Sequence, residues 1–478
     1  MDAGFWETQL AEWIGGRRII LTAQVAAACT PTVERLRRLG AGDAFVLDTH
    51  GSGTGAVPDC AGLSLALDAS GLSLDESIHQ GQRALGDLPP DAVAALDAFD
   101  PDRTALVIGD FLTESPTLAG RPFLAHRRPE WLALDDKTAI DAFWDRAGIA
   151  RAPSAVVQAT PDAVAAVWAH VDRGDGVVLA VDATHGWTGG AEGTRPVRDR
   201  SRLSEAFDGW EGRTMRVTPF LEGVPCSIHG IVFADHVAVF RPVELVVLRR
   251  GDEFFAGAEP QGEATNRHGS VFRLAKPDET SIVRHAGGLL GSFFYAGCSS
   301  IWDPPPAARE QMRATARRAG EQLRAEVGYR GAFTVDGVLT ADGFRPTELN
   351  PRNGAGLGTM SRELDFPLQL LLDALVGGVE LDWRAPELES GLLQHFDEHR
   401  AGGTWRMIPT AAVEPRQLVH GDDHGLVGPA VSGCFVRMPM QRPAGTFLGP
   451  HAADFWQWAD AELGLGIGSL APAAQRWI

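Results

Sequence analysis

Residues 331–358 read GAFTVDGVLTADGFRPTELNPRNGAGLG, a pattern that predicts a β-hairpin. Residues 332–340 are rich in strand-forming side chains, Ala341-Asp342-Gly343 is a turn signal, and residues 344–350 form the returning strand. With those three turn residues as the loop, Asp336 lies opposite Glu348 and both side chains project from one face. A β-bulge would shift this register by one residue.

Three oxygen-bearing side chains share that face of the predicted hairpin. Asp336 and Glu348 are cross-strand partners, and Asn350 points the same way because it lies two residues beyond Glu348. Two carboxylates and an amide oxygen suit Mg²⁺, which prefers hard oxygen ligands and usually also binds substrate phosphates. Arg352 and three glycines follow, and they supply a cation and pliable backbone. Spacing alone leaves open the alternative of an ordinary hairpin with surface acids.

Composition narrows the class of protein. A length of 478 residues suggests about three domains, and the apolar fraction of 44% is typical of a globular protein. The net charge of −19 argues against nucleic acid and anionic membrane surfaces as partners. We find neither a signal peptide nor an apolar run of membrane-spanning length. The five cysteines show no zinc-like spacing, so reduced thiols and a cytoplasmic location are expected.

Lysine is rare in this chain. Only Lys137 and Lys276 occur among the 43 basic residues. A lysine that persists where arginine is so favoured can be one that arginine cannot replace, although chance survival is the alternative. Lys276 lies in a polar stretch that fits chance, whereas Lys137 stands at the predicted start of a helix that runs to Ala147.

The first part of the chain predicts a Rossmann-like α/β domain. Strands are expected at residues 18–21, 44–48 and 105–109, with helices at 32–39 and 90–98. The glycine-rich run at 50–55 lacks the order of a dinucleotide-binding loop and is expected to be a flexible loop. No G-x-x-x-x-G-K-[ST] segment occurs in the sequence, which argues against a P-loop nucleotide site.

The remaining pattern predicts a smaller α/β unit, a larger sheet and a distinct C-terminal piece. The smaller unit spans about 156–220, with a strand at 177–181, a glycine-rich loop at 182–193 and a strand-to-turn segment at 215–223. Beyond it we expect strands at 227–240 and 244–248, and helices at 305–327 and 367–376. In the C-terminal piece, strands are expected at 404–413 and 433–440 and a Trp-rich helix at 451–463. His420-Gly421-Asp422-Asp423-His424 consists of turn formers and is expected to be a solvated loop rather than a metal site.

Two segments carry a family resemblance. Arg345-Pro346-Thr347-Glu348-Leu349-Asn350-Pro351-Arg352 and Trp131-Leu132-Ala133-Leu134-Asp135-Asp136-Lys137-Thr138 resemble the ATP-grasp carboxylate–amine ligases. The order of the elements is similar to the bacterial group with a pre-ATP-grasp domain, to which the pheganomycin peptide ligase belongs. The resemblance implies an α/β fold, α+β in parts: a Rossmann-like pre-ATP-grasp domain at 1–130, an ATP-grasp domain at 131–380 with its lid at about 155–220, and a C-terminal α+β extension at 381–478.

The resemblance also implies a reaction and the residues that perform it. A carboxylate would attack the γ-phosphate of ATP to give an acyl phosphate and ADP, and an amine would then displace phosphate to leave an amide. Asp336, Glu348 and Asn350 would hold Mg²⁺, with Mn²⁺ as the alternative metal, and Arg352 would stabilise the transferring phosphoryl group. Lys137 would contact the ATP phosphates. The glycine-rich loop would fold over them, and the hinge would bind adenine; the implied residues are Gly186, Gly189, Gly190, Thr218, Phe220, Leu221 and Glu222.

Two departures from the family pattern concern the lid. The strand 177–181 has no lysine, and His185, Arg195 and Arg198 are the candidates to compensate for it. The acidic hinge residue expected near Thr218 is either Glu222 or absent. Arg241, on a strand expected to border the cleft together with Glu244, is a candidate to bind a substrate carboxylate. An ion pair at Arg241 is the alternative.

We therefore predict an ADP-forming ligase of specialised metabolism that joins a carboxylate to an amino acid or short peptide. A γ-glutamyl-type ligase, which activates a side-chain carboxylate, remains open, and so does a nucleotide-binding protein with impaired catalysis. A carboxylase or kinase-like member is disfavoured because no Met-Lys biotin-attachment pair occurs. The N-terminal domain is expected to line the acceptor pocket. The C-terminal extension is expected to pack against the core and to shape the amine site or a homodimer contact.

Overall fold

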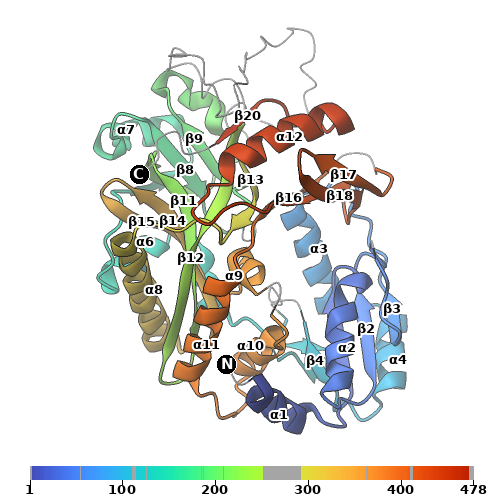
Figure 1. Ribbon diagram of the computed structural model, residues 1–478. Coiled ribbons are helices and arrows are strands. Elements are labelled where there is room, and N and C mark those ends of the chain that lie inside the picture. Colours follow the sequence, from blue (N-terminus) through green and yellow to red (C-terminus); the bar gives the residue numbers. More distant parts are fainter. Residues whose placement is uncertain are drawn as a thin grey trace.

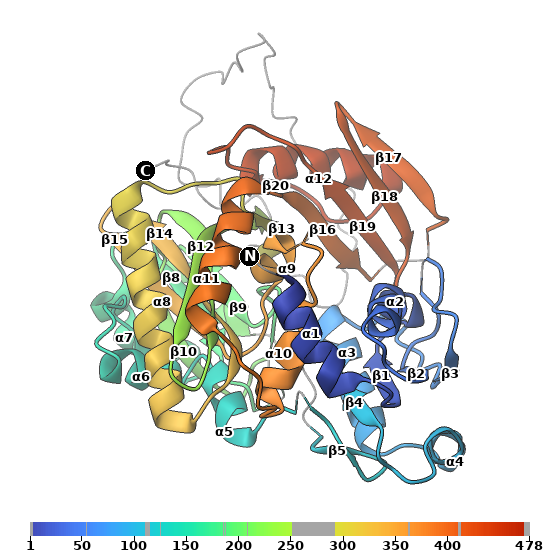
Figure 2. The ribbon, with the colours of Figure 1, turned by 60° about the horizontal axis from the view of Figure 1, so that its bottom comes forward.

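The computed structural model describes residues 3–53, 55–109, 115–124, 126–184, 186, 188–207, 209–250, 292–361, 364–409 and 413–472 (Figure 1). Lys276 and His185, both named above, lie outside the described residues. In two views of the ribbon, the N-terminal unit and the C-terminal sheet lie on one side of the molecule and the lid on the other (Figures 1 and 2). The central sheet stands between them.

The N-terminal unit is built on a parallel sheet with strand order β3-β2-β1-β4. Its elements are α1 (Ala3–Ile14), β1 (Ile19–Ala23), α2 (Thr30–Arg38), β2 (Ala44–Asp48), β3 (Ala61–Ser64), α3 (Leu74–Gly86), α4 (Pro90–Phe99) and β4 (Leu106–Ile108), followed by the short pair β5 (Thr117–Leu118) and β6 (Arg121–Pro122). The predicted α/β pattern is confirmed, while α1, β3 and α3 were not foreseen. The strand order reverses between β1 and β4, because β2 follows β1 on one side and β4 returns on the other.

The lid is an antiparallel sheet with strand order β7-β10-β8-β9. It comprises β7 (Ala155–Gln158), α7 (Pro161–Val171), β8 (Val177–Val181), β9 (Thr194–Val197) and β10 (Thr214–Pro219). Alternate residues of β8 and β10, including Leu179 and Val217, pack with Trp168 of α7 in a core of their own. The short helices α5 (Pro129–Leu132) and α6 (Ile140–Arg146) precede the lid.

The central sheet has the order β13-β12-β11-β14-β15, and the C-terminal strand β20 also pairs with β12. Its strands are β11 (Val224–Val232), β12 (Val237–Arg250), β13 (Ser292–Ser299), β14 (Gly331–Thr340), β15 (Gly343–Asn350) and β20 (Leu470–Pro472). The prediction of one strand over 227–240 is wrong, because the chain turns at Phe233–His236, where Phe233 N donates to His236 O.

Helices cover both faces of the central sheet. They are α8 (Pro306–Val327), α9 (Ala355–Met360), α10 (Leu368–Val376) and α11 (Ala385–Glu398). Phe333 and Val335 share a core with α8, whereas Ala332 belongs to the core that contains α10 and α11. The even-numbered side chains of β14 therefore face away from α8, and this is the face that carries Asp336.

The C-terminal piece is a four-stranded antiparallel sheet with a helix. Its elements are β16 (Gly403–Ile408), β17 (Arg416–His420), β18 (Asp423–Pro429), β19 (Cys434–Pro439) and α12 (Gly449–Leu463). The buried Glu244 of β12 accepts hydrogen bonds from Leu448 N at 2.8 Å and Gly449 N at 2.9 Å, where α12 begins. Together with the pairing of β20, this contact joins the C-terminal piece to the central sheet, as predicted. The expected solvated loop at 420–424 is smaller than predicted: Gly421 and Asp422 form the turn, while His420 ends β17 and the buried Asp423 begins β18. His420 Nε2 lies 2.9 Å from Asp454 Oδ2.

Within the described part of the chain, no helix combines the length and the apolar character needed to cross a bilayer.

Candidate functional site

The hairpin of β14 and β15 brings Asp336 and Glu348 into register as cross-strand partners. The turn that joins the two strands differs from the predicted one. The turn has two residues, since Thr340 pairs with Gly343, and the register then shifts by one between Asp336 and Gly337. A bulge at Thr347 thus offsets the shorter turn and restores the alignment of the two carboxylates.

Asp336, Asn350 and Arg352 form a chain of polar contacts on this face. Asn350 Nδ2 donates to Asp336 Oδ2 at 3.0 Å, and Arg352 Nη2 donates to Asn350 Oδ1 at 2.7 Å. Desolvation and the nearby Glu348 carboxylate raise the pKa of Asp336 to about 7, against the opposing attraction of Arg352 and Lys137. The site therefore holds a carboxylate whose charge the protein neutralises only in part.

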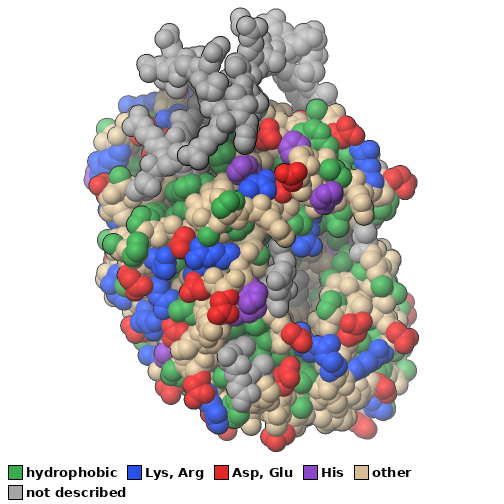
Figure 3. Space-filling model, in the orientation of Figure 1, with side chains coloured by type: hydrophobic (Ala, Val, Ile, Leu, Met, Phe, Trp, Pro, Cys, Tyr) green, Lys and Arg blue, Asp and Glu red, His purple; other side chains and the backbone are tan. Residues whose placement is uncertain are grey.

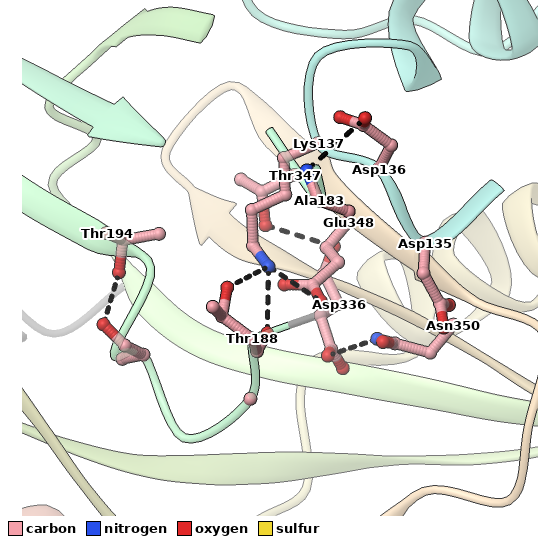
Figure 4. A network of polar contacts seen from close by, with 12 residues as sticks. Asp135, Asp136, Lys137, Ala183, Thr188, Thr194, Asp336, Thr347, Glu348 and Asn350 are labelled. Carbon is pink, nitrogen blue, oxygen red and sulfur yellow. Dashed lines mark hydrogen bonds and ion pairs between the residues drawn. The ribbon is translucent and has the colours of Figure 1, made fainter. Parts of the chain in front are cut away.

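Lys137 completes the cluster and reaches it from the segment before α6 (Figure 4). It lies in the turn that precedes α6 rather than in the helix itself, and it is only 7% exposed. Its Nζ lies 3.3 Å from Glu348 Oε1 and donates to Thr188 O at 3.1 Å. Lys137, which its rarity and the family resemblance both singled out, therefore contacts the hairpin and the glycine-rich loop.

The glycine-rich loop contacts the N-terminal unit, and this contact was not predicted from the sequence. Gly189 N donates to Asp75 Oδ2 at 2.6 Å, and Asp75 is a buried residue in the first turn of α3. A Cβ at Gly186, whose φ is +102°, would lie 2.7 Å from His79 Cε1 on the same helix. Burial raises the pKa of Asp75, while His79, Lys137 and Arg352 favour its charged form. The capping box of Ser73 and Glu76 could have revealed α3 from sequence, but not this long-range contact.

The C-terminal piece also contacts the loop. Arg406 of β16 lies 4.0 Å from Glu192, at the end of the glycine-rich segment, and its Nη1 donates to Tyr295 O at 2.7 Å. Gly190 lies between these contacts with a φ of +54°. The loop is therefore bounded by the N-terminal unit, by Lys137 and by the C-terminal piece.

The predicted hinge residues lie at the end of β10 and directly after it. Thr218 is buried in β10, and Phe220 N donates to Gly176 O at 2.8 Å. The guanidinium groups of Arg198 and Arg249 each lie 4.9 Å from the centre of the Phe220 ring. Leu221 and Glu222 follow.

Glu222 and Arg198 form part of an ion-pair group at this hinge. Glu222 Oε1 lies 3.3 Å from Arg249 Nη2 and 3.5 Å from Arg198 Nη1. Arg195, the other described candidate to replace the lid lysine, lies over the Trp210 ring and donates to Ala206 O. Neither arginine is placed by these contacts beside Lys137 or the hairpin.

A buried arginine that the sequence reading missed joins the lid to the hairpin. Arg216 of β10 pairs with Ala180 of β8 in the lid sheet. Its Nη2 lies 2.6 Å from Asp141 Oδ1, and its Nη1 donates to Thr347 O at 2.8 Å. Nothing in the local sequence distinguishes Arg216 from the other arginines of this chain.

Arg241 is not brought to the cluster. Its guanidinium lies 2.6 Å from Asp397 Oδ1 of α11 and 3.6 Å from Asp303 Oδ1, and it donates to Trp302 O. The structure thus has the ion-pair arrangement that was the alternative for this residue. A role for Arg241 in substrate binding stays a prediction without support from these contacts.

The donor set at the hairpin fits a divalent cation that also binds phosphates. In the described residues, no group of three or more His, Cys, Asp and Glu side chains is arranged to hold a metal ion. Two carboxylates and an amide instead lie together, and one of them, Asp336, is desolvated with a raised pKa. Mg²⁺ is typically bound by one or two carboxylates plus substrate phosphates and water, so this incomplete set suits it.

Comparison with known proteins supports the fold. No family model matches the chain, and no curated protein sequence matches it. Among solved structures, it is similar to the biotin carboxylase domain of a single-chain bacterial carboxylase, with a TM-score of 0.52 and 16% identity over 95% of this chain and 90% of that one. It is equally similar to part of Rhizobium etli pyruvate carboxylase, with a TM-score of 0.52 and 16% identity over 93% of this chain and 37% of that one. Together with its lid and central antiparallel sheets, these likenesses show that the chain has the fold of the ATP-grasp superfamily.

Proposed function

We propose that this protein is an ATP-dependent ligase that joins a carboxylate to an amine and releases ADP and phosphate. The observation that carries the proposal is the convergence of Asp336, Glu348 and Lys137 at one end of a rigid hairpin, with Arg352 one contact away through Asn350. Phosphoryl transfer needs positioned cations more than covalent chemistry, and this cluster combines metal-binding oxygens with two fixed cations.

The reaction has two steps. A carboxylate oxygen of the first substrate attacks the γ-phosphorus of ATP, the bond to the β,γ-bridging oxygen breaks, and ADP leaves. The amine nitrogen of the second substrate then attacks the acyl carbon, phosphate departs with the carboxylate oxygen, and the nitrogen loses a proton. The products are an amide, ADP and phosphate.

Each residue of the cluster has a role in that scheme. Asp336, Glu348 and Asn350 would hold Mg²⁺, which when bound neutralises charge on the β- and γ-phosphates; Mn²⁺ is the alternative metal. Lys137 orients the phosphates as a compact charge, and Arg352 stabilises the transferring phosphoryl group. The loop with Gly186, Gly189 and Gly190 excludes water, which would otherwise hydrolyse the acyl phosphate. Thr218, Phe220, Leu221 and Glu222 border the adenine ring.

The test is ADP release by Asp336→Asn and Glu348→Gln at saturating Mg²⁺. We expect each variant to lose about 100-fold or more in rate, because an electrostatic group at the reacting phosphate is removed. Asp342→Asn, in the exposed turn of the same hairpin, is the matched control and should retain full activity. Undiminished ADP release by both site variants would show that the metal assignment is wrong.

A nucleotide-binding protein with impaired catalysis is the rival from another class. The absence of lysine from β8 favours it, because the lid then contributes less charge to the phosphates. ATP binding by calorimetry without ADP release, across a broad panel of carboxylates and amines, would select this rival. A γ-glutamyl-type product would instead be recognised from its fragmentation in mass spectrometry.

The biological setting is part of the same proposal. We propose small-molecule substrates, an amino acid or short peptide among them, and a cytoplasmic enzyme of specialised metabolism. Five cysteines without a disulfide among them and the acidic surface support this setting. A homodimer, tested by light scattering, is compatible with the proposal but is not needed by it, since the cluster is built from one chain.

A further inference from the structure

A cavity of about 520 Å³ lies where the strand order of the N-terminal sheet reverses. It is lined by residues at the carboxyl ends of β1 and β4, including Thr22, Gln24 and Ile108. In open parallel sheets, ligands bind at this reversal point, beyond the carboxyl ends of the strands. The volume lies in the range of pockets that hold small molecules.

Two helices from different parts of the chain form opposite walls of the cavity. The N-terminal unit contributes Ala28 and Arg35, the latter from α2, while α10 of the core contributes Gln369 and Asp373. Leu368 and Phe366 add apolar surface on the core side. Figure 3 shows the surface hollowed between the N-terminal unit and the rest of the molecule. The lining thus combines an apolar wall with one cation and one carboxylate on opposing helices.

The cavity is connected to the proposed reaction centre through α10. Gln369 and Asp373 also line a smaller cavity that reaches Arg352 and Asn353. Asn353 Nδ2 donates to Gln369 Oε1 at 3.2 Å, and Gln369 Nε2 donates to Asp373 Oδ1 at 2.9 Å. Gln369, on the α10 wall of the large cavity, is therefore hydrogen-bonded to Asn353, the residue that follows Arg352 in the chain.

We propose that this cavity binds the amine substrate, as an α-amino acid or short peptide with an apolar side chain. The inference rests on the proposed ligase function. The ammonium group lies toward Asp373, on the side of Arg352, and the carboxylate lies toward Arg35. Arg35 Nη2 is 2.9 Å from Asp365 Oδ1, but Asp365 is 85% exposed, so a substrate carboxylate can take its place at little cost. After loss of its proton, the nitrogen is then on the side from which it would attack the acyl phosphate.

Calorimetry on the full chain tests the proposal. A panel of free amino acids and dipeptides, apolar and polar, is titrated into protein that holds Mg²⁺ and a non-hydrolysable ATP analogue. Ala28→Trp fills the cavity from its exposed wall, and Ala98→Trp on the exposed face of α4 is the matched control. We expect apolar members to bind wild type and the control, and to bind Ala28→Trp at least about tenfold more weakly. Affinity for the ATP analogue should be the same in all three proteins.

The outcomes separate this inference from the proposed function. If no panel member binds wild type, or if binding to Ala28→Trp is unchanged, the cavity does not hold the amine substrate, whatever the ADP-release assay gives. If N-acetyl amino acids bind as tightly as free ones, the proposed orientation is wrong. If amino acids bind and Ala28→Trp abolishes binding, but no pair yields ADP, the ligase proposal fails while the cavity remains an amino-acid site.

Discussion

Lys137 Nζ lies 3.3 Å from Glu348 Oε1, so the lysine before α6 and the hairpin carboxylate neutralise each other across the site. Side-chain exposure is 8% for the lysine and 22% for the glutamate. In the proposed function, Lys137 contacts the phosphates of Mg²⁺-ATP and Glu348 helps to bind its metal ion. Binding of Mg²⁺-ATP would therefore exchange one ion pair for two stronger contacts, and Lys137 is held in place until then.

We predict that Lys137→Met lowers kcat/KM for ATP by about 100-fold or more, since it removes a phosphate contact and the hydrogen bond to Thr188 O. Lys137→Arg should have a kcat/KM about 10-fold or more below that of wild type, because the planar guanidinium cannot replace a compact ammonium in a buried site. Steady-state ADP release measures both effects. Arg83→Met on the exposed side of α3 controls for loss of a positive charge, and equal activity of Lys137→Met and this control would refute the assignment.

Gly356→Ala should destabilise the protein. A Cβ at this position would lie 2.1 Å from His229 Nε2 and 2.7 Å from Val243 Cγ2, so buried groups would have to move. Overpacking of this kind costs about 1–3 kcal/mol in the free energy of unfolding. Gly358→Ala in the same helix meets nothing within 4 Å and should be neutral or stabilising by up to about 1 kcal/mol. Urea denaturation compares the two, and equal stability would contradict this packing.

His229 should make stability fall as the pH drops. It is fully buried between Ser227 Oγ at 3.0 Å and Thr334 Oγ1 at 2.8 Å, and burial lowers its pKa from 6.5 to about 3. The folded state therefore binds the proton more weakly than the unfolded state. The stabilisation is present above pH 6.5 and is lost toward pH 3 at about 1.4 kcal/mol per pH unit.

Denaturation of wild type and His229→Gln between pH 7.5 and 5 measures that contribution, because glutamine does not titrate. The difference in unfolding free energy between the two proteins should shrink as the pH falls below 6.5. Parallel pH profiles would mean that His229 does not remain neutral in the fold.

Asp75→Ala should loosen the glycine-rich loop. The variant removes the acceptor for Gly189 N, which lies beside Thr188 and Lys137. We expect faster hydrogen exchange at residues 188–190 and a higher KM for ATP, with the fold intact. Asp91→Ala removes an exposed carboxylate from the first turn of α4, the place that the buried Asp75 has in α3, and should change neither quantity. Unchanged exchange in Asp75→Ala would show that the contact does not restrain the loop.

The sequence predicted the hairpin that carries Asp336 and Glu348 better than the residues around it. Asp336 and Glu348 pair as expected because strand periodicity determines which side chains share a face, even though the turn was one residue shorter and Thr347 forms a bulge. Asp75 and Arg216 could not be predicted, since each depends on the docking of separate units. The ion pair of Arg241 could not be predicted either: its place on a strand was foreseen, but its partner Asp397 comes from α11, 156 residues away.

The most direct test of the central claim follows an oxygen atom. A carboxylate substrate identified by the ADP-release screen is labelled with ¹⁸O in its carboxyl group, and the phosphate formed during one turnover is analysed by mass spectrometry. Activation through an acyl phosphate at the Asp336–Glu348 hairpin predicts one ¹⁸O atom in the released phosphate and its loss from the amide product. Phosphate without ¹⁸O, formed together with ADP, would contradict it.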